Sequence, residues 1–218
     1  MKTLIAIPCM DQVPSAFCQS ISTLNRVDEC MIAFQVGSLV YESRNKLAQK
    51  AIEADADWVL WLDSDMVFNG DLLRRMLETA TKEKTDFVTG VYYRRVEPYT
   101  PTLFKTLDFD GGICTWSDVD EIPDKPFEVA GCGFGAVLLH TQVLYDVVAK
   151  FDGRMFHPLD GVGEDLSFCW RARQCDYKII ADPTLPLGHM GHMMITKAHC
   201  DAYRKLKETK GAGNTAPV

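Results

Sequence analysis

The sequence lacks an apolar run near the roughly 18 residues that a membrane-spanning helix needs. Its N-terminal stretch MKTLIAIPCMDQVP is interrupted by Pro8 and Asp11 too early to serve as a signal peptide. We therefore expect a cytoplasmic protein. The sequence also lacks an excess of positive charge, since the net charge is −7, which argues against a broadly basic nucleic-acid surface.

The chain has eight cysteines but no C-x-x-C pair, and their spacing is irregular. Without a secretory signal we expect reduced thiols that behave as small buried hydrophobic residues, and neither a disulfide framework nor a zinc site. The 218 residues, 47% of them hydrophobic and 24% charged, are typical of a globular protein with a substantial core.

Apolar runs that predict strands alternate with runs that predict helices in the first half of the chain. The predicted strands are 3–8, 30–35, 58–62 and 86–92, and the predicted helices are 15–24, 40–54 and 69–80. Near-continuous apolar strands separated by helices predict an α/β fold with a largely parallel sheet covered on both faces.

The second half of the chain changes character at residue 93. Residues 93–135 contain many Pro and Gly residues and predict hairpins or a loop-rich layer. The remaining predicted elements are helices at 141–149 and 164–174, a strand at 178–180 and a helix at 195–207. We therefore expect one domain over 1–192, followed at 193–218 by a helix and a flexible tail.

The stretch DWVLWLDSDMVF places Asp63 and Asp65 at the end of a predicted strand. Side chains at i and i+2 of a strand point to the same face, so the two carboxylates emerge together. The loop IPCMDQ follows the first strand and would open on the same rim, where open α/β sheets bind ligands. A divalent cation would relieve the repulsion and could hold a diphosphate, although a solvated turn also explains the pattern.

The run SRNKLAQKAIEADADWVLWLDSDMVF resembles the centre of family 2-type glycosyltransferases, in which an Arg-Asn helix leads into a strand that ends in D-x-D. The segment EVAGCGFGAVLLH resembles the Gly-rich acceptor-side loop and strand of that family. The segment GEDLSFCWRARQCDYKIIADPTLPLGHMGH resembles its E-D helix, the next strand and a metal-binding histidine. The resemblance spans about residues 3–192. It implies a GT-A (Rossmann-like) fold with a small antiparallel acceptor-side layer.

The resemblance implies a nucleotide-sugar-dependent hexosyltransferase in which a metal ion holds the donor diphosphate. Asp63 would contact the ribose or the metal, Asp65 would coordinate Mn²⁺ or Mg²⁺, and His189 would complete the coordination, with His192 as a competing ligand. Imidazole favours Mn²⁺ over Mg²⁺. Further candidates for the nucleotide-sugar pocket are Pro8, Asp11, Arg44, Asn45 and Ser64. Arg44 could instead be an ordinary residue of a helix surface.

Glu164 and Asp165 open a predicted helix, and the resemblance makes Asp165 the base of an inverting transfer, with Glu164 contacting the acceptor or orienting the loop. The helix dipole would keep such a carboxylate ionised, although ordinary helix-end electrostatics also explains both residues. In the loop GCGFG, Gly131, Cys132 and Gly133 would lie against the acceptor, because glycine permits positive φ and close approach. A strand bulge is the alternative explanation of that loop.

The sequence departs from the family at the end of the second strand, where FQVGSLVYESRN has no early acidic residue to hold the nucleotide base. The donor is therefore a UDP- or GDP-sugar without further assignment, and the oligomeric state stays open. The compact chain resembles small stand-alone transferases of bacteria and phages. A saccharide, a lipid-linked glycan, a protein or a modified DNA base could be its acceptor. Two other hypotheses are a haloacid-dehalogenase-like phosphatase that uses Asp63 of DSDMV, and a non-catalytic sugar-nucleotide-binding module.

Overall fold

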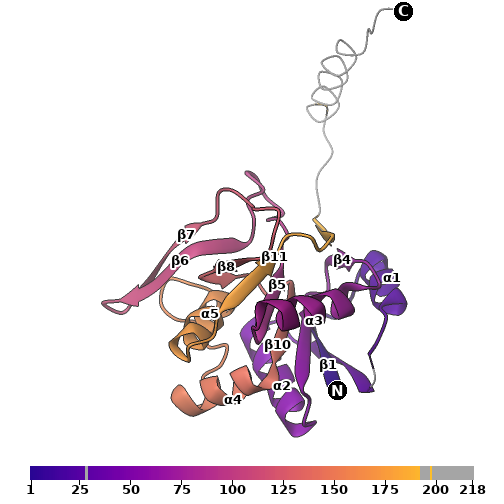
Figure 1. Cartoon of the computed structure of the whole chain (residues 1–218), viewed down its shortest axis with the longest axis horizontal. Helices are drawn as coiled ribbons and strands as arrows, with labels where there is room; N and C mark the ends of the chain where they lie inside the picture. The colour runs from indigo at the N-terminus through magenta and orange to yellow at the C-terminus, as the bar shows by residue number, and fades with distance from the viewer. Residues whose placement is uncertain (28, 192–196, 198–218) are drawn as a thin grey trace, which may run out of the picture.

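The computed structural model describes residues 1–27, 29–191 and 197, which contain a seven-stranded sheet in the order β2-β1-β3-β10-β5-β11-β8 (Figure 1). The strands are β1 Lys2–Cys9, β2 Glu29–Val36, β3 Trp58–Leu62, β5 Phe87–Gly90, β8 Phe127–Val129, β10 Ala136–His140 and β11 Ile179–Asp182. All but β10 and β8 run in one direction. The predicted α/β fold with a largely parallel sheet is confirmed.

Five helices among the described residues cover this sheet. They are α1 Ser15–Thr23, α2 Val40–Glu53, α3 Leu72–Glu83, α4 Thr141–Lys150 and α5 Glu164–Gln174. Each predicted helix of the described part is present. The start of α3 is later than predicted because residues 69–71 form a turn, in which the Leu72 amide donates to the Asn69 carbonyl. No helix in the described ranges has the length and apolar character to cross a bilayer. The predicted segment at 193–218 lies outside these ranges except for Lys197.

The side chains of β1 alternate between two cores, one on each face of the sheet. Leu4 and Ala6 pack into the core that includes residues of α2, α4 and α5, whereas Ile5 and Ile7 pack into the core that includes residues of α1 and α3. A strand buried on both faces is apolar at nearly every position, which explains the run LIAI in the first strand.

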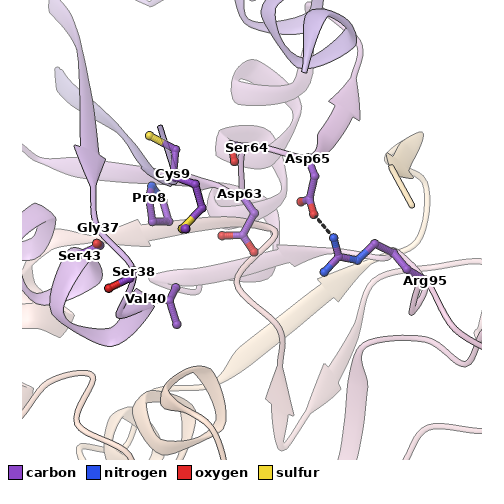
Figure 2. Close-up of a pocket in the computed structure, with 11 residues that line it drawn as sticks. Pro8, Cys9, Gly37, Ser38, Val40, Ser43, Asp63, Ser64, Asp65 and Arg95 are labelled. Carbon is purple, nitrogen blue, oxygen red and sulfur yellow. Dashed lines mark hydrogen bonds and ion pairs between the residues drawn. The ribbon is translucent and has the colours of Figure 1, made fainter. Parts of the chain in front are cut away.

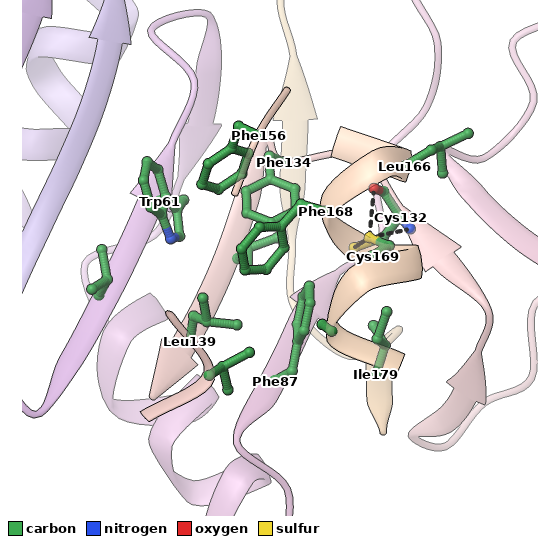
Figure 3. Close-up of a cluster of buried hydrophobic side chains, with 14 of the residues drawn as sticks. Trp61, Phe87, Cys132, Phe134, Leu139, Phe156, Leu166, Phe168, Cys169 and Ile179 are labelled. Atoms are coloured by element: carbon green, nitrogen blue, oxygen red, sulfur yellow. Dashed lines mark hydrogen bonds between the residues drawn. The ribbon is translucent and has the colours of Figure 1, made fainter. Parts of the chain in front are cut away.

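A group of aromatic rings joins β3 to α5 inside the first core (Figure 3). Trp61 of β3 lies 5.2 Å from Phe156 between ring centroids, and Phe156 stacks on Phe168 of α5 at 4.4 Å. Phe134 contacts all three rings edge-on. Since interiors pack densely, this group fixes the spacing between the end of β3 and the start of α5.

Two small sheets complete the fold. Strand β7 (Ile113–Asp118) pairs with β6 (Leu103–Asp110), which pairs with β9 (Gly131–Cys132), and this confirms the predicted hairpin-rich layer. Strand β4 (Met66–Phe68) pairs antiparallel with β12 (Leu187–His189), so that His189 lies opposite Met66. The sequence did not predict this second pairing, which brings the end of the described chain beside the DSD segment.

The backbone conformation of the glycines in GCGFG differs from the prediction. Gly131, Gly133 and Gly135 do not have positive φ, so that part of the prediction is wrong. A Cβ atom at Gly133 would lie 2.3 Å from the Tyr92 hydroxyl oxygen, and one at Gly135 would lie 2.6 Å from Tyr92 Cζ. Gly133 and Gly135 are therefore required by the close packing of the buried Tyr92 ring, not by a special backbone conformation.

Candidate active site

A cavity of about 290 Å³ opens at the rim where β1, β2 and β3 end (Figure 2). Its lining residues are Pro8, Cys9, Met10, Gly37, Ser38, Val40, Ser43, Asp63, Ser64, Asp65 and Arg95. The loops that follow the first and third strands thus meet as predicted, because the carboxyl ends of parallel strands share one edge. Pro8, Ser64 and both DSD carboxylates face this cavity. Asp11 is exposed and does not line it.

Asp63 belongs to a buried ion-pair group that links β3, α2 and α5. Its Oδ1 accepts from Nη2 of Arg44 at 3.0 Å, and Nε of the same arginine donates to Oε1 of Glu164 at 3.2 Å. Arg44 is only 3% exposed and its guanidinium lies 5.2 Å from the centroid of the Phe134 ring. The reading of Arg44 as a helix-surface residue is therefore wrong. Burial raises the pKa of Asp63, and the attraction of Arg44 offsets this only in part.

Asp65 belongs to a more open group at the mouth of the cavity. Its Oδ2 accepts from Nη1 of Arg95 at 2.6 Å and lies 3.5 Å from Nε2 of His189. The Met190 amide donates to the Asp65 carbonyl at 2.9 Å. Burial alone would raise the pKa of Asp65, but the hydrogen bond and charge of His189 and the charge of Arg95 together lower it.

The orientation of His189 decides what can lie between it and Asp65. Its Nδ1 is 2.8 Å from the carbonyl oxygen of Tyr93, so Nδ1 must carry a proton and donate to that acceptor. In the neutral ring Nε2 then presents a lone pair toward Asp65 Oδ2, which is also an acceptor. Two facing acceptors need a proton or a metal cation between them. The contact with Asp65 accordingly raises the pKa of His189.

The distance between Asp65 Oδ2 and His189 Nε2 is suitable for two ligands of one divalent cation, and both atoms are electron-pair donors. Two ligands bound to one cation at ordinary distances lie roughly 3.0 to 3.6 Å apart, and the observed separation is 3.5 Å. Within the described ranges no three His, Cys, Asp or Glu residues form a metal-binding group, and Oδ1 of Asp63 accepts from Arg44. Substrate oxygens and water would have to fill the remaining positions. His192 lies outside the described residues.

Glu164 and Asp165 form the first turn of α5 as predicted. Asp165 Oδ1 accepts from the Leu166 amide at 2.8 Å. Burial and the neighbouring charge of Glu164 raise the pKa of Asp165 to about 6, and Arg44 offsets this only in part. The pKa is thus raised and not lowered, because burial has the larger effect on this carboxylate. A carboxylate with a pKa near 6 is ionised at neutral pH and is a stronger base than an ordinary aspartate.

Several predicted site residues have structural contacts away from the cavity. Asn45 Oδ1 accepts from the Phe156 amide at 3.0 Å, so it holds the segment that precedes α5. Gly131, Cys132 and Gly133 are buried, and none of them lines the cavity. Their contact with an acceptor stays a prediction.

The sequence analysis missed Arg95, which lines the cavity and contacts Asp65. One signal could have found it. The pair Arg94-Arg95 closely follows the carboxyl end of a predicted strand, which is the criterion that selected Asp63 and Asp65.

Comparisons with known proteins agree with this geometry. Residues 37–125 match the family model Glycosyl transferase family 2, a range that includes Arg44, the DSD segment and Arg95 but ends before α5. No curated protein matches the sequence. The crystal structure of A197 from STIV is similar, with a TM-score of 0.63 and 22% identity over 88% of this chain and 87% of that one.

A crystal structure of GalNAc-T7 with UDP, GalNAc and Mn²⁺ is also similar, with a TM-score of 0.61 and 11% identity. The alignment covers 88% of this chain but 43% of that one, so the chain spans less than half the length of GalNAc-T7. At these identities the two structures establish the shared fold alone. Both findings agree with the resemblance seen in the sequence: residues 37–125, less than half of the chain, are similar to glycosyl transferase family 2, and the chain shares the fold of these two structures, which is consistent with GT-A.

Proposed function

We propose that this chain is a metal-dependent hexosyltransferase that moves a sugar from a UDP- or GDP-sugar to an acceptor hydroxyl with inversion. The observation that carries the proposal is the pair of facing acceptors, His189 Nε2 and Asp65 Oδ2, at the cavity that follows β1 and β3. GalNAc-T7, with the same fold, was crystallised with UDP, GalNAc and Mn²⁺, which supports a nucleotide and a metal in such a cavity.

Asp65 and His189 would hold Mn²⁺, or Mg²⁺ in its place, at the mouth of the cavity. The bound cation would neutralise the charge that grows on the departing nucleoside diphosphate. Asp63 keeps one oxygen on Arg44, so its other oxygen is available to the donor's ribose. The residues that follow β2 supply Gly37 and Ser38 to the cavity but no carboxylate. The nucleotide base of the donor is therefore left unassigned.

Asp165 is the proposed base. An acceptor hydroxyl held against its carboxylate would lose its proton to it while the hydroxyl oxygen attacks the anomeric carbon and the diphosphate leaves from the opposite face. The raised pKa of about 6 suits this role at neutral pH. Arg44 acts as a positioning residue, because it ties Glu164 beside this base to Asp63 on the donor side.

Thermal denaturation with UDP and GDP, each in Mn²⁺ and in EDTA, tests the donor half of this function. Ligands that bind the native state raise its melting temperature, so we expect a much larger rise with Mn²⁺ than with EDTA. Equal shifts in the two buffers would refute the metal assignment. Mn²⁺-dependent hydrolysis of a panel of nucleotide-sugars would then name the donor.

The phosphatase hypothesis makes a different prediction. A haloacid-dehalogenase-like enzyme would form a covalent phosphate on Asp63, which can be trapped and located by mass spectrometry. The family match and the ion pair of Asp63 Oδ1 with Arg44 favour the transferase. A trapped phosphoaspartate at this position would reverse that preference.

A further inference from the structure

Arg95 is the one basic side chain among the residues that line the cavity (Figure 2). It belongs to the segment between β5 and β6, and its guanidinium points to the Asp65 carboxylate. Within the described part of the chain, Asp65 is its only hydrogen-bond partner. The side chain is 49% exposed, so few packing contacts oppose its movement.

The neighbouring arginine has a different environment. Arg94 donates to Asp118 Oδ1 of β7 at 2.7 Å, and its guanidinium lies 5.7 Å from the centroid of the Phe104 ring. It does not line the cavity. The two adjacent arginines carry the same charge, but only Arg95 faces the donor site.

Arg95 and a metal cation compete for one atom. Arg95 Nη1 contacts Asp65 Oδ2, which is also the oxygen that lies 3.5 Å from His189 Nε2. A cation held by Asp65 and His189 would take a lone pair of this oxygen and would repel a guanidinium in contact with it. The guanidinium of Arg95 and the cation therefore compete for Asp65 Oδ2.

The displaced guanidinium has an anionic partner within the same cavity. A nucleoside diphosphate carries more negative charge than one divalent cation neutralises, and the planar fork of Arg matches phosphate oxygens with two parallel hydrogen bonds. Arg95 lines the cavity and reaches Asp65 Oδ2 at 2.6 Å, so its guanidinium already lies beside the atom that would bind the cation.

We propose that Arg95 exchanges partners during the reaction cycle: it neutralises Asp65 in the empty site and binds the donor diphosphate once a divalent cation has taken Asp65. This inference rests on the proposed function. It assigns to Arg95 a role in holding the leaving group and in lowering metal affinity until the donor arrives.

The test measures the affinities for Mn²⁺ and for pyrophosphate, which substitution of Arg95 should change in opposite directions. Binding of MnCl₂ alone is measured by the electron paramagnetic resonance of free Mn²⁺, and binding of inorganic pyrophosphate at saturating Mn²⁺ is measured by calorimetry. For Arg95→Gln we expect Mn²⁺ to bind about threefold to tenfold more tightly, because a competing positive charge is gone. Pyrophosphate should bind about tenfold more weakly, because a charged hydrogen-bond donor is lost.

Arg94→Gln is the matched control, since it removes the same charge one residue away and should change both affinities less than about twofold. Weaker or unchanged Mn²⁺ binding in Arg95→Gln would overturn the competition, and unchanged pyrophosphate binding would overturn the transfer to the diphosphate. Failure of the wild-type protein to bind Mn²⁺ at all would instead refute the proposed function, so the two failures are distinguishable.

Discussion

The two carboxylates of DSD are each paired with an arginine, but the two pairs lie in contrasting environments. Asp63 pairs with Arg44, which is 3% exposed and also contacts Glu164. Asp65 pairs with Arg95, which is 49% exposed and has no second hydrogen-bond partner among the described residues. The same chemical pairing therefore serves as a fixed part of the scaffold in one case and as an exchangeable contact in the other.

Burial explains this difference. Arg44 is buried, so breaking its pair with Asp63 would leave the guanidinium with one partner fewer and no water to replace it, and we expect this pair to persist. An exposed pair contributes little to stability and can be exchanged at low cost. A D-x-D motif can thus combine a rigid anchor with a ligand that is released to a metal, although its two carboxylates are separated by one residue.

The largest expected effect is a difference in Mn²⁺ affinity between variants of the two carboxylates. Asp65→Asn should weaken Mn²⁺ binding by about 10²-fold or more, because it removes a charged ligand. Asp63→Asn should change Mn²⁺ affinity much less, because that carboxylate is directed to Arg44. Calorimetric titration of both variants with Mn²⁺ provides the comparison. Equal losses would mean that Asp63 is also a metal ligand, which is one of the two roles that the family resemblance implied for it.

The second effect concerns Asp165, the proposed catalytic base next to Glu164. Asp165→Asn should lower the rate of sugar transfer by about 10²-fold while leaving donor and Mn²⁺ affinity nearly unchanged. In the wild-type protein the rate should rise with pH through about 6, since only the ionised carboxylate accepts a proton. Steady-state assays between pH 5 and pH 8 measure both. Near-normal turnover in the variant, or a product that retains the anomeric configuration of the donor, would exclude the inverting mechanism.

A third effect compares the two arginines by stability. Arg44→Met should lower the free energy of unfolding by about 3 kcal/mol, because Asp63 and Glu164 lose their shared partner inside the protein. Arg95→Met should change it by less than about 0.5 kcal/mol. Urea denaturation of both variants tests this. A similar cost for the two substitutions would remove the distinction between an anchored and an exchangeable pair.

The smallest effect is a gain in stability. The pKa of Asp165 is higher in the folded protein, at about 6, than the ordinary value of 3.8. The folded state therefore holds this proton more tightly, and stability is lost as the pH rises toward and through 6. Asp165→Asn should thus raise the free energy of unfolding by about 1 to 3 kcal/mol at pH 8. The gain should vanish near pH 4, and a gain that does not change with pH would contradict this cause.

The sequence was sufficient for the five strands of the main sheet that run in one direction and for Asp63 and Asp65 at its carboxyl rim, whereas the apolar pattern did not identify β8 or β10. Apolar runs such as TLIAI and WVLWL identify strands buried on both faces, and Asp63 and Asp65 follow directly from strand periodicity. Such local patterns are informative about the fold because the burial of a strand can be predicted from the apolar residues of that strand alone.

Long-range contacts could not be predicted from local patterns. The pairing of β4 with β12 joins residues 66–68 to residues 187–189, and nothing near Met66 indicates that partner. The burial of Arg44 depends on Glu164 and Phe134, which are distant in sequence. The pKa of Asp165 followed burial and not its place in the first helical turn, because desolvation depends on the whole surrounding core.

A crystal structure of the protein with Mn²⁺ and pyrophosphate, with anomalous scattering recorded at the manganese edge, tests the central claim most directly. We predict an anomalous peak between Asp65 and His189, with Arg95 moved from Asp65 to the pyrophosphate and Arg44 still paired with Asp63 and Glu164. A peak elsewhere in the protein, or Arg95 still on Asp65 beside a bound diphosphate, would contradict it.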